Sequence, residues 1–152
     1  MSNDISTFLA TILSEEQELQ FVAFDSSNAL ELGLLNVKNA KQKAYPVVIQ
    51  ITINNFLLFH YAMFGTTPAD VETASRLGAI VNKYHHSNAY VNIKEEDGHG
   101  GLSGGGFPLI IKGTVIGSIV VAGGIAVDDY ELVVGTLKEY LGMEKEGKNK
   151  VE

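Results

Sequence analysis

Residues 47–62 read VVIQITINNFLLFHYA, and this stretch decides the fold. Its first half places an apolar side chain at every second position, which is the period of a β-strand with one buried face. Asn54-Asn55 then offers a turn, because asparagine tolerates positive φ. Residues 56–62 are apolar again and return as a second strand. The stretch therefore predicts an antiparallel hairpin.

Further strands and helices are predicted on both sides of this hairpin. Short apolar runs predict strands at 19–24, 108–111 and 115–122. Apolar residues at helical spacing, together with capping residues, predict helices at 4–17, 25–44, 67–81 and 128–141. Within 84–97, Ser87 caps a short helix through Tyr90 and Ile93, which we favour, or the segment is extended. The first of these helices carries the expected buried stripe Ile5, Phe8, Leu9, Ile12 and Leu13, and the second carries Leu30, Gly33, Leu34, Val37, Ala40 and Ala44.

The order of these elements predicts an α+β fold. Hairpins outnumber β-α-β units, so we expect a mostly antiparallel, five-stranded sheet flanked by helices. No linker or internal repeat divides the chain, and 152 residues suit one domain. We expect that domain to span residues 1–141, followed by a charged, flexible tail over 142–152.

The composition excludes several classes of function. The chain has no cysteine, which excludes disulfides, zinc–thiolate sites and cysteine nucleophiles. Its net charge is −7 and no basic stripe is present, so we expect no nucleic-acid partner. The uncharged run 113–127 is shorter than the roughly 18–20 apolar residues of a membrane span, so we expect no membrane insertion. The N-terminus lacks the basic region of a signal peptide, which favours a cytoplasmic location.

The histidines are the first candidates for chemistry. His60 lies in a predicted strand and should face away from Phe59 and Tyr61, which we expect to point into the core. This leaves His60 as a hydrogen-bonded structural residue or as a ligand to heme or a metal. His86 follows a predicted helix and His99 lies in a glycine-rich run. The spacing of the histidines matches no zinc motif, so no metal site is predicted.

Six of the nine residues from 98 to 106 are glycine. The run has neither the Gly-Lys-Ser/Thr of a P-loop nor the spacing of a dinucleotide-binding loop. Gly104, Gly105 and Gly106 have no side chains to block a close approach, so exposed N–H groups there could bind a carboxylate or a heme propionate. A flexible surface loop explains the same composition. Asp128-Asp129 stands at a predicted helix start, where capping is the expected role.

Several motifs in a fixed order resemble one family. These are Gly104-Gly105-Gly106-Phe107-Pro108-Leu109, Gly113-Thr114-Val115-Ile116-Gly117-Ser118-Ile119 and Val121-Ala122-Gly123-Gly124, preceded by Leu58-Phe59-His60-Tyr61-Ala62 and Gly65-Thr66-Thr67-Pro68. Over residues 19–141 the chain resembles the heme-degrading-domain family of GlcG/HbpS-like proteins, and in particular a bacterial and fungal branch of it.

The resemblance implies a profilin-like sheet, assembly into homo-oligomers and the binding of a cofactor or ligand that is either heme or another small anion. It points to His60, His86, Gly105, Gly106 and the loop around His99 as ligand-binding residues. The chain departs from the branch in having no tryptophan and in having Tyr130 where the branch has histidine; Tyr130 could still bind iron as tyrosinate.

Three functions stay open at this point. The first is a ligand-binding protein of the heme-binding type. The second is a homo-oligomeric, partner-binding or chaperone-like module without small-molecule chemistry. The third is a heme-degrading enzyme, which would need an external reductant and dioxygen because the chain carries no redox group of its own.

Overall fold

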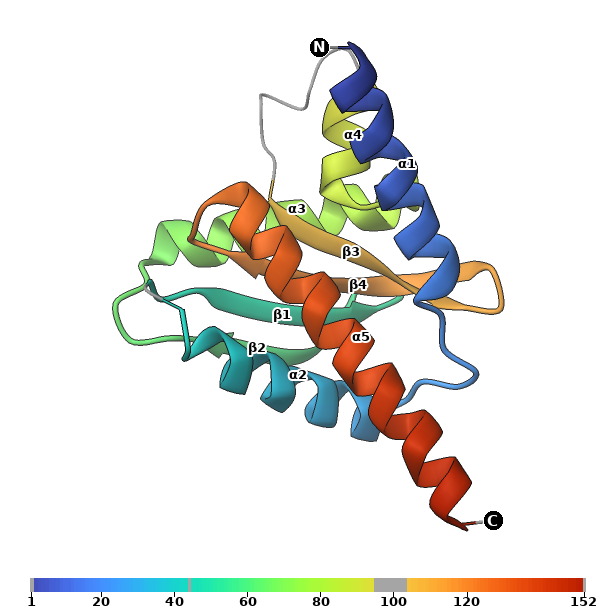
Figure 1. Cartoon of the computed structure of the whole chain (residues 1–152). Coiled ribbons are helices and arrows are strands. Elements are labelled where there is room, and N and C mark those ends of the chain that lie inside the picture. The colour runs from blue at the N-terminus through green and yellow to red at the C-terminus, as the bar shows by residue number, and fades with distance from the viewer. Residues whose placement is uncertain (1, 44, 95–103, 152) are drawn as a thin grey trace.

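The computed structural model describes residues 2–43, 45–94 and 104–151 of the chain (Figure 1). In chain order the elements are α1 (Ser2–Glu18), α2 (Ser26–Ala40), β1 (Val48–Ile53), β2 (Phe56–Ala62), α3 (Pro68–Tyr84), α4 (Asn88–Lys94), β3 (Gly105–Ile111), β4 (Thr114–Ala122) and α5 (Ala126–Val151). The mixture of helices with one antiparallel sheet confirms the predicted α+β class.

The sheet has the strand order β2-β1-β4-β3, and every neighbouring pair is antiparallel. The predicted hairpin forms β1 and β2, and its turn residues Asn54 and Asn55 have φ of 51° and 65°. The second turn, Lys112-Gly113, also lies at positive φ, 48° and 84°. Both tight turns therefore use the left-handed backbone region that asparagine and glycine tolerate best.

The prediction of a five-stranded sheet is wrong for the described chain, in which the sheet has four strands. The segment predicted as a strand at 19–24 makes one isolated parallel bridge, between Phe21 and Ile111. Leu19 and Phe21 are nevertheless buried in the core. The apolar run is therefore explained by side chains that are buried against the edge of the sheet, and not by a strand that pairs along that edge. The profilin-like arrangement stays a prediction.

The two faces of the sheet differ in chemistry and in cover. Figure 1 shows α2 and α5 on one face and α3 on the other. The face under α2 and α5 is fully apolar, with Ile49, Ile51, Phe107, Leu109, Ile119 and Val121 all completely buried. The face under α3 alternates Val48 and Val120 with the polar residues Gln50, Thr52 and Ser118. The main core therefore lies between the sheet and the α2–α5 layer.

The predicted helix stripes are only partly correct. In α1 Ile12 is buried, but Ile5, Phe8 and Leu13 are exposed, since the helix packs against the molecule on one narrow side. In α2 Leu30 and Leu34 are exposed as well. The buried side of α2 runs through Ala29, Leu32, Gly33, Asn36, Val37 and Ala40. Gly33 admits the Phe59 ring, since a Cβ there would lie 2.5 Å from it.

The helix starts follow the capping residues. Asp25 caps α2 and Thr67 caps α3, each in a reciprocal capping box with the residue three positions later, Asn28 and Asp70. The last helix, α5, continues to Val151, past residue 141 at which we expect the domain to end; the flexibility of the charged tail stays a prediction. Within the described residues, no helix is both long and apolar enough to cross a membrane.

Candidate functional site

Two neighbouring glutamates attach α1 to the rest of the molecule. Glu16 is only 7% exposed, and its carboxylate binds two groups at the start of α4. Oε1 lies 2.6 Å from Nδ1 of His86, and Oε2 accepts the Ser87 N–H at 3.0 Å. Ser87 also accepts the Tyr90 N–H at 3.3 Å, which caps α4. The short helix predicted in this region is confirmed.

The Glu16 contact determines how the His86 ring can be used. A carboxylate only accepts hydrogen bonds, so Nδ1 carries the proton in this pair. In the neutral ring Nε2 is then left as an acceptor. The ring stacks on Tyr90, with centroids 3.9 Å apart, and the side chain remains 34% exposed. A buried carboxylate that orients a histidine in this way is the arrangement that supports histidine ligands to metals.

Tyr130 is held as a protonated phenol, whereas binding of iron needs the tyrosinate. Its hydroxyl donates to Oε1 of Glu15 at 2.8 Å, and Lys138 Nζ lies 3.3 Å from the other oxygen of that carboxylate. Burial, followed by the hydrogen bond and charge of Glu15 and the charge of Glu16, raises the pKa of Tyr130 far above its usual range. The phenolate is therefore disfavoured. The contacts support a role in attaching α1 to α5 instead of the tyrosinate role.

Two predicted site residues, Gly104 and Tyr130, line one cavity between α1, α4 and α5. Its volume is about 160 Å³. The other residues that line it are Phe8, Ala89, Asn92, Ile93, Ala126 and Val127. The lining is mostly apolar, but the volume is below the roughly 300 Å³ at which pockets for drug-sized ligands begin, so a tetrapyrrole does not fit inside it.

The glycines at 104–106 do not form an exposed backbone cradle. All three are buried, and Gly105 and Gly106 pair with Val121 and Val120 inside the sheet. A Cβ on Gly105 would lie 2.8 Å from the backbone of Asp129, and one on Gly106 would collide with Oδ1 of Asn88. The prediction of bare, accessible N–H groups is wrong here, because these glycines let α4 and α5 approach β3. Contact with a ligand stays a prediction.

His60 lies at the opposite edge of the sheet from His86. It is exposed on β2, and its Nδ1 accepts from Nε2 of Gln50 at 3.2 Å. Of its two neighbours, Phe59 packs against the core as predicted, but Tyr61 is exposed. His60 is therefore not brought together with His86, Gly104 and Tyr130. His99 falls outside the described residues. Among the described residues, no group of three or more potential metal ligands occurs.

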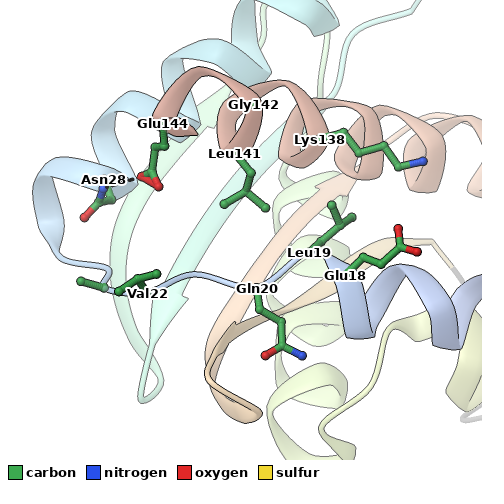
Figure 2. A pocket seen from close by; sticks show the side chains of 10 residues that line it. Glu18, Leu19, Gln20, Val22, Asn28, Lys138, Leu141, Gly142 and Glu144 are labelled. Atoms are coloured by element: carbon green, nitrogen blue, oxygen red, sulfur yellow. Dashed lines mark hydrogen bonds between the residues drawn. The ribbon is translucent and has the colours of Figure 1, made fainter. Parts of the chain in front are cut away.

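A larger cavity was not signalled by any sequence motif. It has a volume of about 910 Å³ and lies between α5, the start of α2 and the segment that follows α1 (Figure 2). It is lined by Glu18, Leu19, Gln20, Val22, Ala23, Asn28, Lys138, Leu141, Gly142 and Glu144. This volume would hold a tetrapyrrole, but the lining has no histidine, tyrosine or methionine. The space for a tetrapyrrole and the side chains that could bind iron thus lie in different places.

Comparison with known proteins gives one family. The family model "Haem degrading protein HbpS-like" matches residues 24–138, which confirms the resemblance seen in the sequence motifs. A UPF0303 protein of Paraburkholderia phymatum is 36% identical over 153 residues, covering 91% of this chain and 93% of the relative. A UPF0303 protein of Serratia proteamaculans is 30% identical over 154 residues, covering 92% and 96%.

Solved structures share the fold at low sequence identity. The Ybr137w protein has a TM-score of 0.81 at 18% identity, with 90% of this chain and 88% of that chain covered. The PduOC:Heme complex has a TM-score of 0.67 at 18% identity, with 77% and 94% covered. HbpS has a TM-score of 0.66 at 18% identity, with 80% and 92% covered.

Proposed function

Because the chain belongs to the family of HbpS-like haem degrading proteins, we propose that it is a heme-binding domain in which Nε2 of His86 is the ligand to iron. The observation that carries this proposal is the pairing of His86 with the buried carboxylate of Glu16. The pairing fixes the proton on Nδ1 and keeps the ring in one orientation. Bound heme would supply the iron and its redox chemistry; the chain supplies the ligand and its orientation.

The surroundings of His86 also suit a flat, apolar ligand. Its ring is stacked on Tyr90, and the side chain keeps about one-third of its surface exposed. The neighbouring helix α1 carries the exposed side chain Leu13 about one turn before Glu16, and Phe8 and Ile5 about two and three turns before it. Exposed apolar side chains gathered near an oriented polar group are typical of ligand-binding surfaces. Heme is the family-related molecule that combines a large apolar plane with an iron to be ligated.

Titration of hemin into the purified protein, followed at the Soret band, tests this proposal. We expect saturable binding by the wild type and a loss of affinity of about tenfold or more for His86→Ala, since the iron ligand is removed. Glu16→Gln should weaken binding by about tenfold, because an amide orients the ring less firmly than a carboxylate.

His85→Asn is the matched control. His85 is exposed at the end of α3 with φ of 63°, a conformation that asparagine tolerates. This variant should bind hemin like the wild type. Equal affinities for the wild type and a folded His86→Ala variant would overturn the assignment of the ligand, and no saturable binding by the wild type would overturn the proposed function.

A second candidate function, a homo-oligomeric partner-binding module, is favoured by a different observation. β2 is an edge strand and carries the exposed apolar residues Phe56 and Leu57. Unpaired edges with apolar side chains are typical sites of association. Native mass spectrometry of the wild type and of Phe56→Glu should show an assembly of copies that the variant weakens. A wild type that is monomeric at all concentrations would contradict it.

A further inference from the structure

We infer that the cavity between α3 and the sheet binds a small, neutral, hydroxyl-rich molecule. The cavity has a volume of about 210 Å³ and lies on the opposite side of the sheet from the main core. It is lined by Gln50, Thr52, Asn55, Leu57, Ser75, Gly78, Ala79, Asn82, Ser118 and Val120. The inference does not depend on heme binding, since His86 is not part of this lining.

The cavity exists because both of its walls depart from ordinary core packing. On the sheet, Gln50 and Ser118 are buried on the same face as the apolar residues Val48 and Val120. On the helix, small residues face them, and at Gly78 a Cβ would lie 3.3 Å from the Ser118 hydroxyl. A closely packed interior would fill such a space with apolar side chains. Here the space is instead lined by polar groups.

These polar groups are positioned by one another and still have hydrogen-bonding capacity. Thr52 Oγ1 and Ser118 Oγ lie 2.9 Å apart, so one hydroxyl proton joins them and the second can be donated elsewhere. The Asn82 amide nitrogen donates to Asn55 Oδ1 at 3.0 Å and to Thr52 Oγ1 at 3.4 Å, which leaves its oxygen to accept. Ser75 donates to Gln50 at 3.4 Å. The cavity wall therefore offers both a free hydrogen-bond donor and a free acceptor. A ligand hydroxyl group can pair with either, because it both donates and accepts.

The charge and the size of the cavity narrow the ligand class. Its lining contains no Asp, Glu, Lys or Arg. An ion bound there would exchange part of its hydration for neutral partners and gain no opposite charge, so a neutral molecule is favoured. At roughly 30 Å³ per water molecule the volume equals about seven waters, which suits a triol or tetrol.

Two glycine variants separate ligand binding from stability. Gly78→Ala adds a methyl group that fits with a small shift, 3.3 Å from Ser118 Oγ and 3.6 Å from Val120 Cγ2, and fills part of the cavity. Gly135→Ala makes the same change in α5, where nothing lies within 4 Å of the new Cβ. Both variants replace a helical glycine by alanine, so each should keep or raise stability, by up to about 1 kcal/mol for Gly135→Ala.

The experiment is a titration of the wild type and both variants with glycerol and with erythritol, followed by amide NMR shifts. We expect saturable shifts at residues 50 and 118, with a Kd on the order of 1 mM for so small a ligand. Gly78→Ala should weaken binding by about tenfold or more, and Gly135→Ala by less than about twofold. Equal binding by the wild type and Gly78→Ala would overturn the inference.

Two further outcomes also overturn it. The first is the absence of saturable shifts with either polyol, which would mean that the cavity holds water only. The second is a preference for glycerol 3-phosphate at these residues, which would mean that the ligand is an anion. Hemin titration of Gly78→Ala should match the wild type, so the result is separable from the test of His86.

Discussion

Replacing Asp129 with asparagine should remove a pH dependence from the stability of the fold. Asp129 is 2% exposed, its Oδ2 accepts the Gly124 N–H at 3.1 Å, and its Oδ1 has no hydrogen-bond partner among the described residues. Burial raises the pKa of this carboxyl from 3.8 to about 7; the Gly124 hydrogen bond opposes the rise and the charge of Asp128 adds to it.

The sign follows from proton linkage. The folded state holds its proton more tightly than the unfolded state, so the stabilisation is fully present below about pH 3.8 and is lost as the pH rises through about 7. A shift of about three pKa units corresponds to about 4 kcal/mol at most, at about 1.4 kcal/mol per unit. The amide of the Asp129→Asn variant stays neutral at every pH. The free energy of unfolding of this variant should therefore rise relative to that of the wild type as the pH rises.

Urea unfolding followed by circular dichroism, from about pH 4 to about pH 8, measures this difference. Asp128→Asn is the matched control: it removes the neighbouring charge but not the burial, which is the larger cause, so most of the pH dependence should persist. Parallel pH profiles for the wild type and Asp129→Asn would refute the reasoning.

Two other substitutions test packing and capping. Gly106→Ala should destabilise the fold by about 1–3 kcal/mol, because its methyl group collides with Oδ1 of the buried Asn88; a melting temperature unchanged from wild type would contradict this packing. Thr67→Ala should cost about 1 kcal/mol, because it removes the α3 cap and its bond to the Asp70 N–H, and Thr67→Ser should restore most of the loss in the same thermal melts.

The sequence predicted the parts of the fold that local chemistry specifies. The hairpin over residues 47–62 has its own turn residues, and α3 begins at its own cap, Thr67, so both were found correctly. Phe21 was misjudged because an apolar run is the same whether it pairs with a strand or only packs against one.

The candidate site was harder to predict because it is formed by contacts between segments that lie far apart in the sequence. Glycine at 105 and 106 suggested a loop, but here it marks where α4 and α5 come close to a strand, which a sequence alone does not distinguish. His86 was predicted as a candidate because histidine is a common ligand. Its partner Glu16 lies 70 positions away and belongs to no recognisable motif, so the pair was not predicted. The large cavity beside Lys138 is made by segments without any shared pattern.

The two faces of the sheet differ in chemistry, and this difference restricts where residues can be inserted or deleted in this protein. Because side chains alternate along a strand, inserting or deleting one residue within β1 would turn Gln50 and Thr52 toward α2 and α5 and place Ile51 under α3. Such a change would bury amide and hydroxyl groups among aliphatic ones along the whole central strand. Gains and losses of residues among relatives should therefore be absent from β1 and collect at its turns.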